Sequence, residues 1–258
     1  MKAFFRRHKV LSISLLCFVL INLYSAIPLV FFYFQKIPDK IDLNQQIIKE
    51  LEEKQGNNFE FIVMSDTSSG LFVMESTTLK LISRINAEDR FTGKTDIDFV
   101  VNVGDVTFRG KEKQYKNYIK IKDRIKFPVI SVIGNHDDDI DNGEKGMELF
   151  NKYCGSEEFS FIDRNSYFIG LDNKGGDLTE SQLENLEKEL NNAKEYENIF
   201  IFMHKPPFNP YQQSWYRIEN SDWSYRFMKM CEKYNVDMVF SGHEYISKVI
   251  DFGGVKYA

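Results

Sequence analysis

Five short apolar runs, rich in β-branched and aromatic residues, constrain the fold of this chain more than any other feature of its sequence. Each run has the length of a β-strand, and segments of helical periodicity lie between the runs. Strands that are apolar on both faces and alternate with helices predict an α/β protein whose sheet is covered by helices. The runs are Phe59–Met64, Ile97–Val103, Pro128–Ile133, Ile199–Met203 and Val236–Phe240, and helices are expected at 71–86, 112–125, 179–194 and 222–234.

Two hairpins are also expected, one in the middle of the chain and one close to its last residue. We therefore predict one domain over 56–258, preceded by a helical stalk or linker over 35–55 in which apolar residues recur at helical spacing. The hairpin strands are Phe159–Ile162 with Tyr167–Leu171, and Ser247–Phe252 with Val255–Tyr257.

The run Val10–Phe34 contains no charged residue, and its 25 residues are enough to cross a hydrocarbon layer of about 30 Å as a helix. Basic residues are concentrated in the segment 1–9 before it, which by the positive-inside rule places the N-terminus in the cytoplasm. We predict a single-pass membrane protein with a transmembrane signal anchor at 10–34 and an extracytoplasmic domain. A cleaved signal peptide and a buried core helix are the alternatives.

Charge is unevenly distributed along the chain. Residues 1–40 carry six Lys or Arg and one Asp, so the remaining 218 residues have a net charge of −10 within the total of −5. Proteins that bind nucleic acid neutralise phosphates with basic side chains. No nucleic-acid binding is therefore expected, and the sequence predicts no particular oligomeric state.

Each of the five apolar runs ends in a side chain that can bind a metal ion. The carboxyl ends of strands in open α/β sheets form ligand sites, so these side chains are expected to meet. Three of the four histidines of the chain are among them. Oxygen and imidazole ligands together suit Mn, Fe or Zn, and a carboxylate can bridge two such ions. The residues are Asp66, Asp105, Asn135 with His136, His204 and His243.

The motifs around these residues resemble those of the calcineurin-like metallophosphoesterases, with the purple acid phosphatases as a related branch. The resemblance covers most of the chain after Phe59, and its most specific motif is Gly-Asn-His-Asp after a strand. It implies a four-layer α/β/β/α sandwich with two metal ions. The motifs are Gly104-Asp105, Gly134-Asn135-His136-Asp137, His204 and Gly242-His243.

The resemblance also implies a role for each residue. Asp105 would bridge the two ions, and Asn135, His204 and His243 would complete the second metal site. His136 would protonate the leaving oxygen or stabilise charge in the transition state.

Two motifs depart from the family pattern, and both departures fall on the first metal site. Ser68 stands where the first motif usually has a histidine, and Tyr245 stands where the last motif usually has its second. Phe108 replaces the tyrosine that compensates in purple acid phosphatases. We therefore predict one tight site and one weakened site that retains Asp66 and Asp105.

The roles of Ser68 and Tyr245 are left open by the sequence. Tyr245 either binds a hard ion such as Fe(III) or packs and forms hydrogen bonds, and Ser68 is expected to donate a hydrogen bond to Asp66 or to water. An oxygen-only first site would favour Mg, Mn or Ca over Zn. Asp172 and Asn173 follow another strand and either line the rim of the site or form a turn.

These features predict a membrane-anchored, metal-dependent phosphoesterase that hydrolyses a phosphate mono- or diester with metal-activated water. The substrate would be a small-molecule, lipid or nucleotide phosphoester. The alternative is a catalytically degenerate domain of the same fold that acts as a binding or scaffold module, since two imidazoles of the family pattern are missing.

Overall fold

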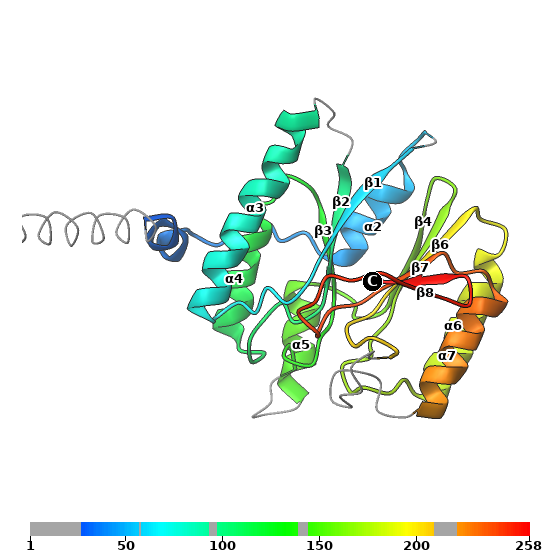
Figure 1. Cartoon of the computed structure of the whole chain (residues 1–258). Coiled ribbons are helices and arrows are strands. Elements are labelled where there is room, and N and C mark those ends of the chain that lie inside the picture. Colours follow the sequence, from blue (N-terminus) through cyan, green and yellow to red (C-terminus); the bar gives the residue numbers. More distant parts are fainter. Residues whose placement is uncertain (1–26, 57, 93–96, 139–143, 209–220) are drawn as a thin grey trace, which may run out of the picture. The chain divides into compact units, whose positions relative to one another are not determined.

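The computed structural model describes residues 27–56, 58–92, 97–138, 144–208 and 221–258 (Figure 1). They divide into two compact units, Met1–Ile37 and Pro38–Ala258. In the first unit the described residues form a helix over 27–34. Among the described residues, no helix has the length and apolar character needed to span a bilayer. The predicted basic segment 1–9 and most of the predicted anchor 10–34 lie outside the described residues.

The first sheet of the larger unit has three parallel strands in the order β1-β2-β3. These are the strands expected from the first three apolar runs, and they follow the predicted bounds to within a residue. Helices α3 and α4 cover the outer face of this sheet, and α5 lies beside α4 (Figure 1). The elements are β1 (Glu60–Met64), α3 (Phe72–Thr92), β2 (Ile97–Val103), α4 (Glu112–Lys122), β3 (Val129–Val132) and α5 (Glu144–Tyr153).

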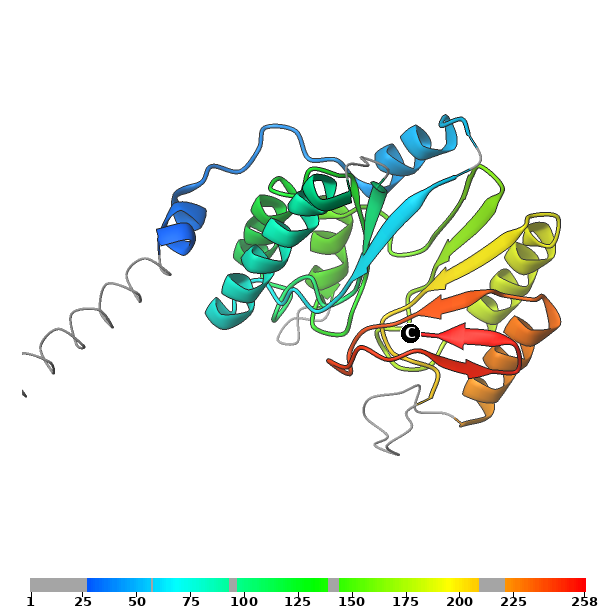
Figure 2. The ribbon, with the colours of Figure 1, turned by 45° about the horizontal axis from the view of Figure 1, so that its top comes forward.

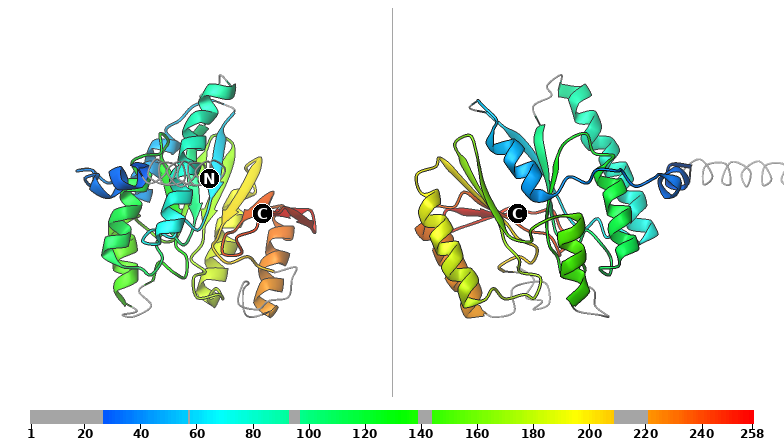
Figure 3. Two further views of the ribbon diagram at one scale, coloured as in Figure 1. Left: turned by 60° about the vertical axis from the view of Figure 1, so that its left-hand side comes forward. Right: turned by 180° about the vertical axis from the view of Figure 1, so that it is seen from behind.

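The second sheet has six strands in the order β4-β5-β6-β7-β9-β8. The two predicted hairpins are its antiparallel pairs, and β9 joins β7 as a parallel neighbour (Figure 2). Helices α6 and α7 cover its outer face (Figure 3). The elements are β4 (Phe159–Asp163), β5 (Ser166–Gly170), α6 (Glu180–Ala193), β6 (Asn198–Phe202), α7 (Ser221–Lys233), β7 (Met238–Phe240), β8 (Ile250–Phe252) and β9 (Val255–Tyr257).

An aromatic core joins the inner faces of the two sheets. Phe99 of the first sheet packs edge-on against Phe168 of the second, with ring centroids 5.5 Å apart. Both rings are fully buried, and burial of each contributes about 1.5–3 kcal/mol to folding. The larger unit is therefore layered as helices, sheet, sheet and helices, and the predicted mixed α/β fold is confirmed.

The five strand ends of the predicted site are divided between the two sheets. β1, β2 and β3 belong to the first sheet, whereas β6 and β7 belong to the second. The strand pattern alone suggested that all five ends lie along one open sheet. Instead, the ends meet because the two sheets of the sandwich face each other.

Helix α2 (Asn44–Glu52) belongs to the domain and is not a separate stalk or linker. Its apolar residues Ile47, Ile48 and Leu51 are buried in the core between the sheets. The buried Asn44 side chain donates to the carbonyl of Ser131 at 2.8 Å and accepts from its amide at 3.0 Å. These bonds tie the helix to the middle of β3, so the domain begins well before residue 56.

Helix α5 is the one described helix of the larger unit that the sequence pattern did not predict. The glycine Gly146 lies in its first turn, and glycine is unfavourable inside helices. The apolar residue Phe150 is nevertheless fully buried. Tertiary burial therefore outweighs the weak local propensity of this segment.

Candidate metal centre

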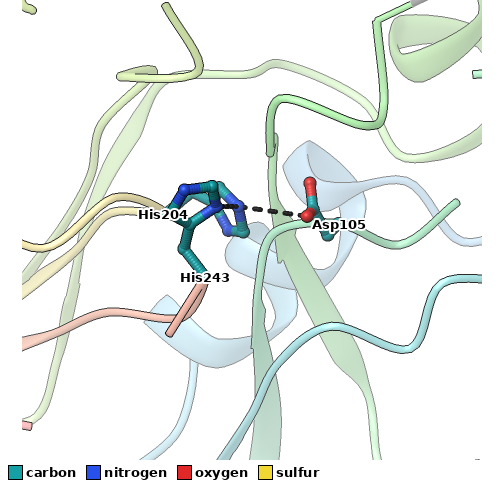
Figure 4. A group of neighbouring side chains, drawn as sticks. All are labelled: Asp105, His204 and His243. Atoms are coloured by element: carbon teal, nitrogen blue, oxygen red, sulfur yellow. Dashed lines mark hydrogen bonds and ion pairs between the residues drawn. The ribbon is translucent and has the colours of Figure 1, made fainter. Parts of the chain in front are cut away.

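The structure brings together ligand atoms from the ends of strands in both sheets. Asp105 follows β2, His204 follows β6 and His243 follows β7, and one ligand atom of each lies within 4.8 Å of the others (Figure 4). Asn135, which follows β3, joins them through its Oδ1, 3.1 Å from His204 Nε2. We call these four residues the His204 cluster.

His204 presents an unshared electron pair to the rest of the cluster. Its Nδ1 lies 2.9 Å from the carbonyl oxygen of Val103. A carbonyl oxygen can only accept, so Nδ1 donates and Nε2 of the neutral ring carries no proton. Around Nε2 lie Oδ2 of Asp105 at 3.3 Å and Nδ1 of His243 at 3.2 Å, besides the Asn135 oxygen.

These spacings fit a single ion. Ligand atoms about 2.0–2.2 Å from one transition-metal ion are separated by about 2.8–3.6 Å at octahedral or tetrahedral angles. The donor set of one carboxylate, one amide oxygen and two imidazoles suits Mn, Fe or Zn. Because four potential ligand atoms converge, this arrangement is suited to a cation.

The electrostatics of the His204 cluster also favour a positive charge at this position. Burial alone would lower the pKa of His204, but the neighbouring Asp105 carboxylate raises it to about 9. Burial likewise acts to raise the pKa of Asp105, and the charge of His204 outweighs it and holds that pKa below its usual range. In the metal-free protein a proton on Nε2 supplies the positive charge that a metal ion would bring.

Asp66 lies beside the cluster with one carboxylate oxygen available. Its Oδ2 accepts from the backbone amide of His243 at 3.0 Å and from the hydroxyl of Ser65. Its Oδ1 is buried and has no hydrogen-bond partner among the described residues. Burial raises the pKa of this carboxyl group. A cation next to Oδ1 would satisfy an otherwise unpaired buried oxygen, which is the arrangement expected of a first metal site.

Glycines allow the ligand loops to approach one another closely. A Cβ atom on Gly104 would lie 2.4 Å from Nδ1 of His204, and one on Gly134 would lie 2.2 Å from Oδ1 of Asp105. Gly104 also has a φ of +97°, which side chains rarely adopt. Any other residue at these two positions would displace a cluster ligand.

His136 is held next to the cluster by two hydrogen bonds. Its backbone amide donates to Oδ1 of Asp105 at 2.9 Å. Its Nδ1 donates to the carbonyl oxygen of Phe108 at 3.0 Å, and the two rings are stacked with centroids 5.8 Å apart. The Nε2 atom is therefore the ring position at which His136 can exchange a proton with a substrate. Phe108, which cannot bind a metal, orients this ring instead.

Ser68 and Tyr245 occupy different environments. Ser68 is buried, and its backbone amide donates to the carbonyl oxygen of Asp105 at 2.9 Å. The side-chain hydroxyl that donates to Asp66 is that of Ser65, and the expected bond from Ser68, either to Asp66 or to water, stays a prediction. Tyr245 is 66% exposed, so most of its side chain faces solvent.

Asp137 connects the loops that carry the cluster, a role that the sequence did not reveal. This fully buried carboxylate accepts from the backbone amides of Val106, Thr107 and Gly134 at 3.2, 2.7 and 2.8 Å. The loop after β2 is thereby joined to the loop after β3. The aspartate of the Gly-Asn-His-Asp motif was the available signal, but the motif alone does not indicate which groups the carboxylate would contact.

Asn173 holds the loop that carries His204 through hydrogen bonds to its backbone. Its Oδ1 accepts from the amides of His204 at 2.9 Å and Lys205 at 3.1 Å, and its Nδ2 donates to the carbonyl of Lys205 at 2.7 Å. The residue is almost completely buried. It therefore anchors the loop after β6 rather than lining the rim of the site.

Comparison with known proteins agrees with this geometry. A model of the calcineurin-like phosphoesterase family matches residues 59–247, which are 189 of the 258 residues. The chain belongs to the calcineurin-like phosphoesterase family. The predicted resemblance is thereby confirmed.

Two curated proteins are similar to this chain over part of its length. A "probable cyclic nucleotide phosphodiesterase" of Xenorhabdus bovienii is 28% identical over 168 residues, which are 62% of this chain and 66% of that protein. A "probable glycerophosphodiester phosphodiesterase GpdQ" of Arcobacter nitrofigilis is 32% identical over 120 residues, 43% of this chain and 42% of that protein. The chain thus spans less than two thirds of the length of these relatives.

Solved structures of the calcineurin-like phosphoesterase fold are similar at lower identity. A purple acid phosphatase from yellow lupin has a TM-score of 0.55 at 17% identity, covering 73% of this chain and 38% of that one. GAP50, the anchor in the inner membrane complex of Plasmodium, has a TM-score of 0.57 at 15% identity, covering 76% and 69%. These similarities concern the fold.

Proposed function

We propose that this chain is a metal-dependent phosphoesterase that uses the His204 cluster as its tight metal site. The observation that carries the proposal is the convergence of three potential ligand atoms on Nε2 of His204. Asp105, Asn135, His204 and His243 would hold a Mn, Fe or Zn ion. Asp66, with Asp105, would hold a second and weaker ion, for which an oxygen-only ligand set favours Mg, Mn or Ca. Bound ions would supply Lewis acidity and an activated water molecule.

The residues of the chain supply the remaining chemistry. His136, held by Asp105 and Phe108, donates a proton from Nε2 to the leaving oxygen of the ester. Its Nδ1 bond to the Phe108 carbonyl fixes the orientation of the ring. Asp105 positions His136 through its Oδ1 and His204 through its Oδ2, so one carboxylate aligns the acid with the metal ligands.

The substrates that this proposal favours are phosphodiesters. The two curated relatives have names that describe phosphodiesterases, one for cyclic nucleotides and one for glycerophosphodiesters. Small-molecule, lipid and nucleotide phosphoesters all contain the group on which the site would act. A phosphate monoester remains a second substrate class to be tested.

Hydrolysis of bis-p-nitrophenyl phosphate and p-nitrophenyl phosphate by the full chain tests the proposal. Activity should appear with Mn, Fe or Zn, and should be lost in both His136→Ala and Asn135→Ala. The His136 variant should still bind the tight ion, as measured by elemental analysis, because its side chain is not a ligand. A folded protein that hydrolyses neither ester with any metal would refute the proposal.

The location of the protein is proposed on its sequence alone. The uncharged run Val10–Phe34 and the basic residues before it favour a membrane anchor with the N-terminus in the cytoplasm and the domain outside it. Carbonate extraction of membranes and protease accessibility of the domain in intact cells would test this. Release of the full-length chain by carbonate would contradict it.

A binding or scaffold role is the second candidate. The observation that favours it is that Ser68 and the mostly exposed Tyr245 replace two ligands of the family pattern. Such a protein would keep its fold after loss of metal and would show no turnover. The hydrolysis experiment above separates the two functions.

A further inference from the structure

A cavity of about 300 Å³ lies at the end of the first sheet that is opposite the metal centre. Its wall includes Pro128 and Val129, where β3 begins, whereas the metal ligands follow the carboxyl ends of the strands. The rest of the wall comes from α2 with the segment before it, and from the last turn of α4 with the loop after it. The volume is at the lower end of the range for small-molecule sites. This cavity is therefore a site separate from the His204 cluster.

Much of the cavity wall is apolar. Ile41, before α2, and Phe127, before β3, both line the cavity and are only half-buried, so part of their apolar surface is accessible to a ligand. Ile119 of α4 lines it between them and is almost completely buried. Removal of apolar surface from water favours binding, so this wall suits a ligand with a short apolar chain.

One charged group of the wall has no carboxylate partner. Lys122 of α4 is half-buried, and its Nζ donates to the backbone carbonyl of Asp42 at 3.0 Å. The carboxylate of Asp42 is paired with Lys40 instead, at 2.8 Å. Burial lowers the pKa of Lys122, because it disfavours the charged form of the ammonium group. Within the described part of the chain, the one hydrogen-bond acceptor of this ammonium group is therefore a neutral carbonyl oxygen.

The other charged side chains of the wall do not change this conclusion. Glu50 and Asp123 are exposed to solvent, and neither forms an ion pair with Lys122 in the described structure. Exposed charges are screened by salt, more strongly than buried ones. The formal charges of the wall also cancel, so net charge does not exclude an anion. The acidic residues are Asp42, Glu50 and Asp123, and the basic residues are Lys40, Lys122 and Lys126.

We propose that this cavity binds an amphiphile whose singly charged anionic group contacts Lys122 and whose apolar chain lies along Ile41 and Phe127. An oxyanion would give the ammonium group a charge-assisted hydrogen bond, which is stronger than its bond to a carbonyl oxygen. A free amphiphile in solution and an anionic lipid of a membrane share this chemistry. The proposal does not depend on the phosphoesterase function, because the cavity and the metal centre lie at opposite ends of the sheet.

Calorimetric titration of the full chain with hexane-1-sulfonate and with hexan-1-ol tests the site. The two probes have the same apolar chain and differ in charge. The sulfonate should bind at least about tenfold more tightly than the alcohol, because only the sulfonate accepts a charge-assisted hydrogen bond from Lys122. Equal affinities, or no binding of either probe, would overturn the proposal.

Two lysine variants of α4 locate the charge that is responsible. Lys122→Met removes the charge and keeps an apolar side chain of similar length, so it should abolish the preference for the sulfonate and leave the affinity for the alcohol unchanged. Lys113→Met is the matched control, since Lys113 is exposed in the first turn of the same helix and does not line the cavity. Sulfonate bound at the metal centre would be unaffected by either variant. A preference that survives in Lys122→Met would overturn the proposal.

Lipid nanodiscs separate the two sources of the ligand. The full chain is compared in discs of phosphatidylcholine with and without phosphatidylglycerol. A rise of at least about 2 °C in the melting temperature with phosphatidylglycerol, absent in Lys122→Met, would identify a membrane lipid as the ligand. The same melting temperature in both discs, together with selective sulfonate binding, would identify a free amphiphile. Either result supports an anionic amphiphile at this site.

Discussion

The two candidate metal positions of this site differ sharply although they adjoin each other. The His204 cluster has four ligand atoms from two sheets, and its central imidazole is fully buried. The position at Asp66 has one carboxylate oxygen that no described residue hydrogen-bonds, and Tyr245 is 66% exposed. Under the proposed assignment, both departures from the family pattern fall at the Asp66 position, while the loops, glycines and buried bonds around the His204 cluster are formed.

Replacing the central ligand should have the largest effect. His204→Ala removes the imidazole on which the other three ligands converge, and a metal ion contributes several kcal/mol to the transition state. We expect at least about a 1,000-fold loss of esterase activity, together with loss of the tight ion. Elemental analysis and hydrolysis of bis-p-nitrophenyl phosphate provide the measurements. Retention of the ion would show that the cluster is not the tight site.

The second prediction concerns Asp137, which hydrogen-bonds the loops that carry Asp105 and Asn135. In Asp137→Asn one carboxylate oxygen becomes an NH₂ group that must face a backbone amide, because both oxygens of Asp137 accept hydrogen bonds. An unsatisfied buried donor costs about 1–3 kcal/mol, which lowers the melting temperature by roughly 2–12 °C in a protein of this size. Thermal unfolding followed by circular dichroism measures the change. An unchanged melting temperature would mean that the loops are held by other contacts.

Asp66→Asn tests the weaker position. The amide oxygen should keep the bonds from His243 and Ser65, which places the NH₂ group where Oδ1 would meet a cation. We expect about a ten- to hundredfold loss of activity with the tight ion retained. A loss as large as that of His204→Ala would show that the two positions are equally important. Asp251→Asn is the matched control.

Removal of metal should make the stability of the protein depend on pH. In the metal-free protein the pKa of His204 is raised to about 9 from an ordinary value of 6.5, so its protonated form favours folding. This stabilisation is complete below pH 6.5 and is lost as the pH rises through 9. The melting temperature should therefore fall by on the order of 5 °C across this range after chelation. Added Mn²⁺ should abolish the fall, because the ion replaces the proton.

Tyr245→Phe should have the smallest effect. The side chain is mostly exposed, so loss of its hydroxyl is expected to change activity by less than about twofold. Metal content should also be unchanged. A clear loss of a second ion would reassign Tyr245 to the weaker position.

The sequence predicted the parts of this site that follow from strand order. The ends of β1, β2, β3, β6 and β7 carry polar residues, and a strand pattern locates such ends well. It could not predict the supports, because Asp137 and Asn173 act through hydrogen bonds between segments distant in sequence. The bond from Asn173 to His204, for example, crosses 31 residues.

The dependence on contacts between distant segments also explains why the predicted and observed folds differ at helices α2 and α5. Apolar periodicity predicted most helices, but α2 was assigned to a linker because nothing in its own residues specifies the Ser131 backbone as a partner. α5 was missed because its propensity is weak and its burial is tertiary. Local sequence therefore predicted elements, while the assignment of elements to layers depended on long-range packing.

The division of the His204 cluster between two sheets has a consequence for biosynthesis. Asp105 and Asn135 are translated with the first sheet, whereas His204 and His243 belong to the second sheet, which is translated later. A nascent chain that exposes only its first half offers two oxygen ligands and no imidazole of the cluster. Metal capture at this site should therefore follow synthesis of the second sheet, so that an ion is retained only by molecules that have closed the sandwich.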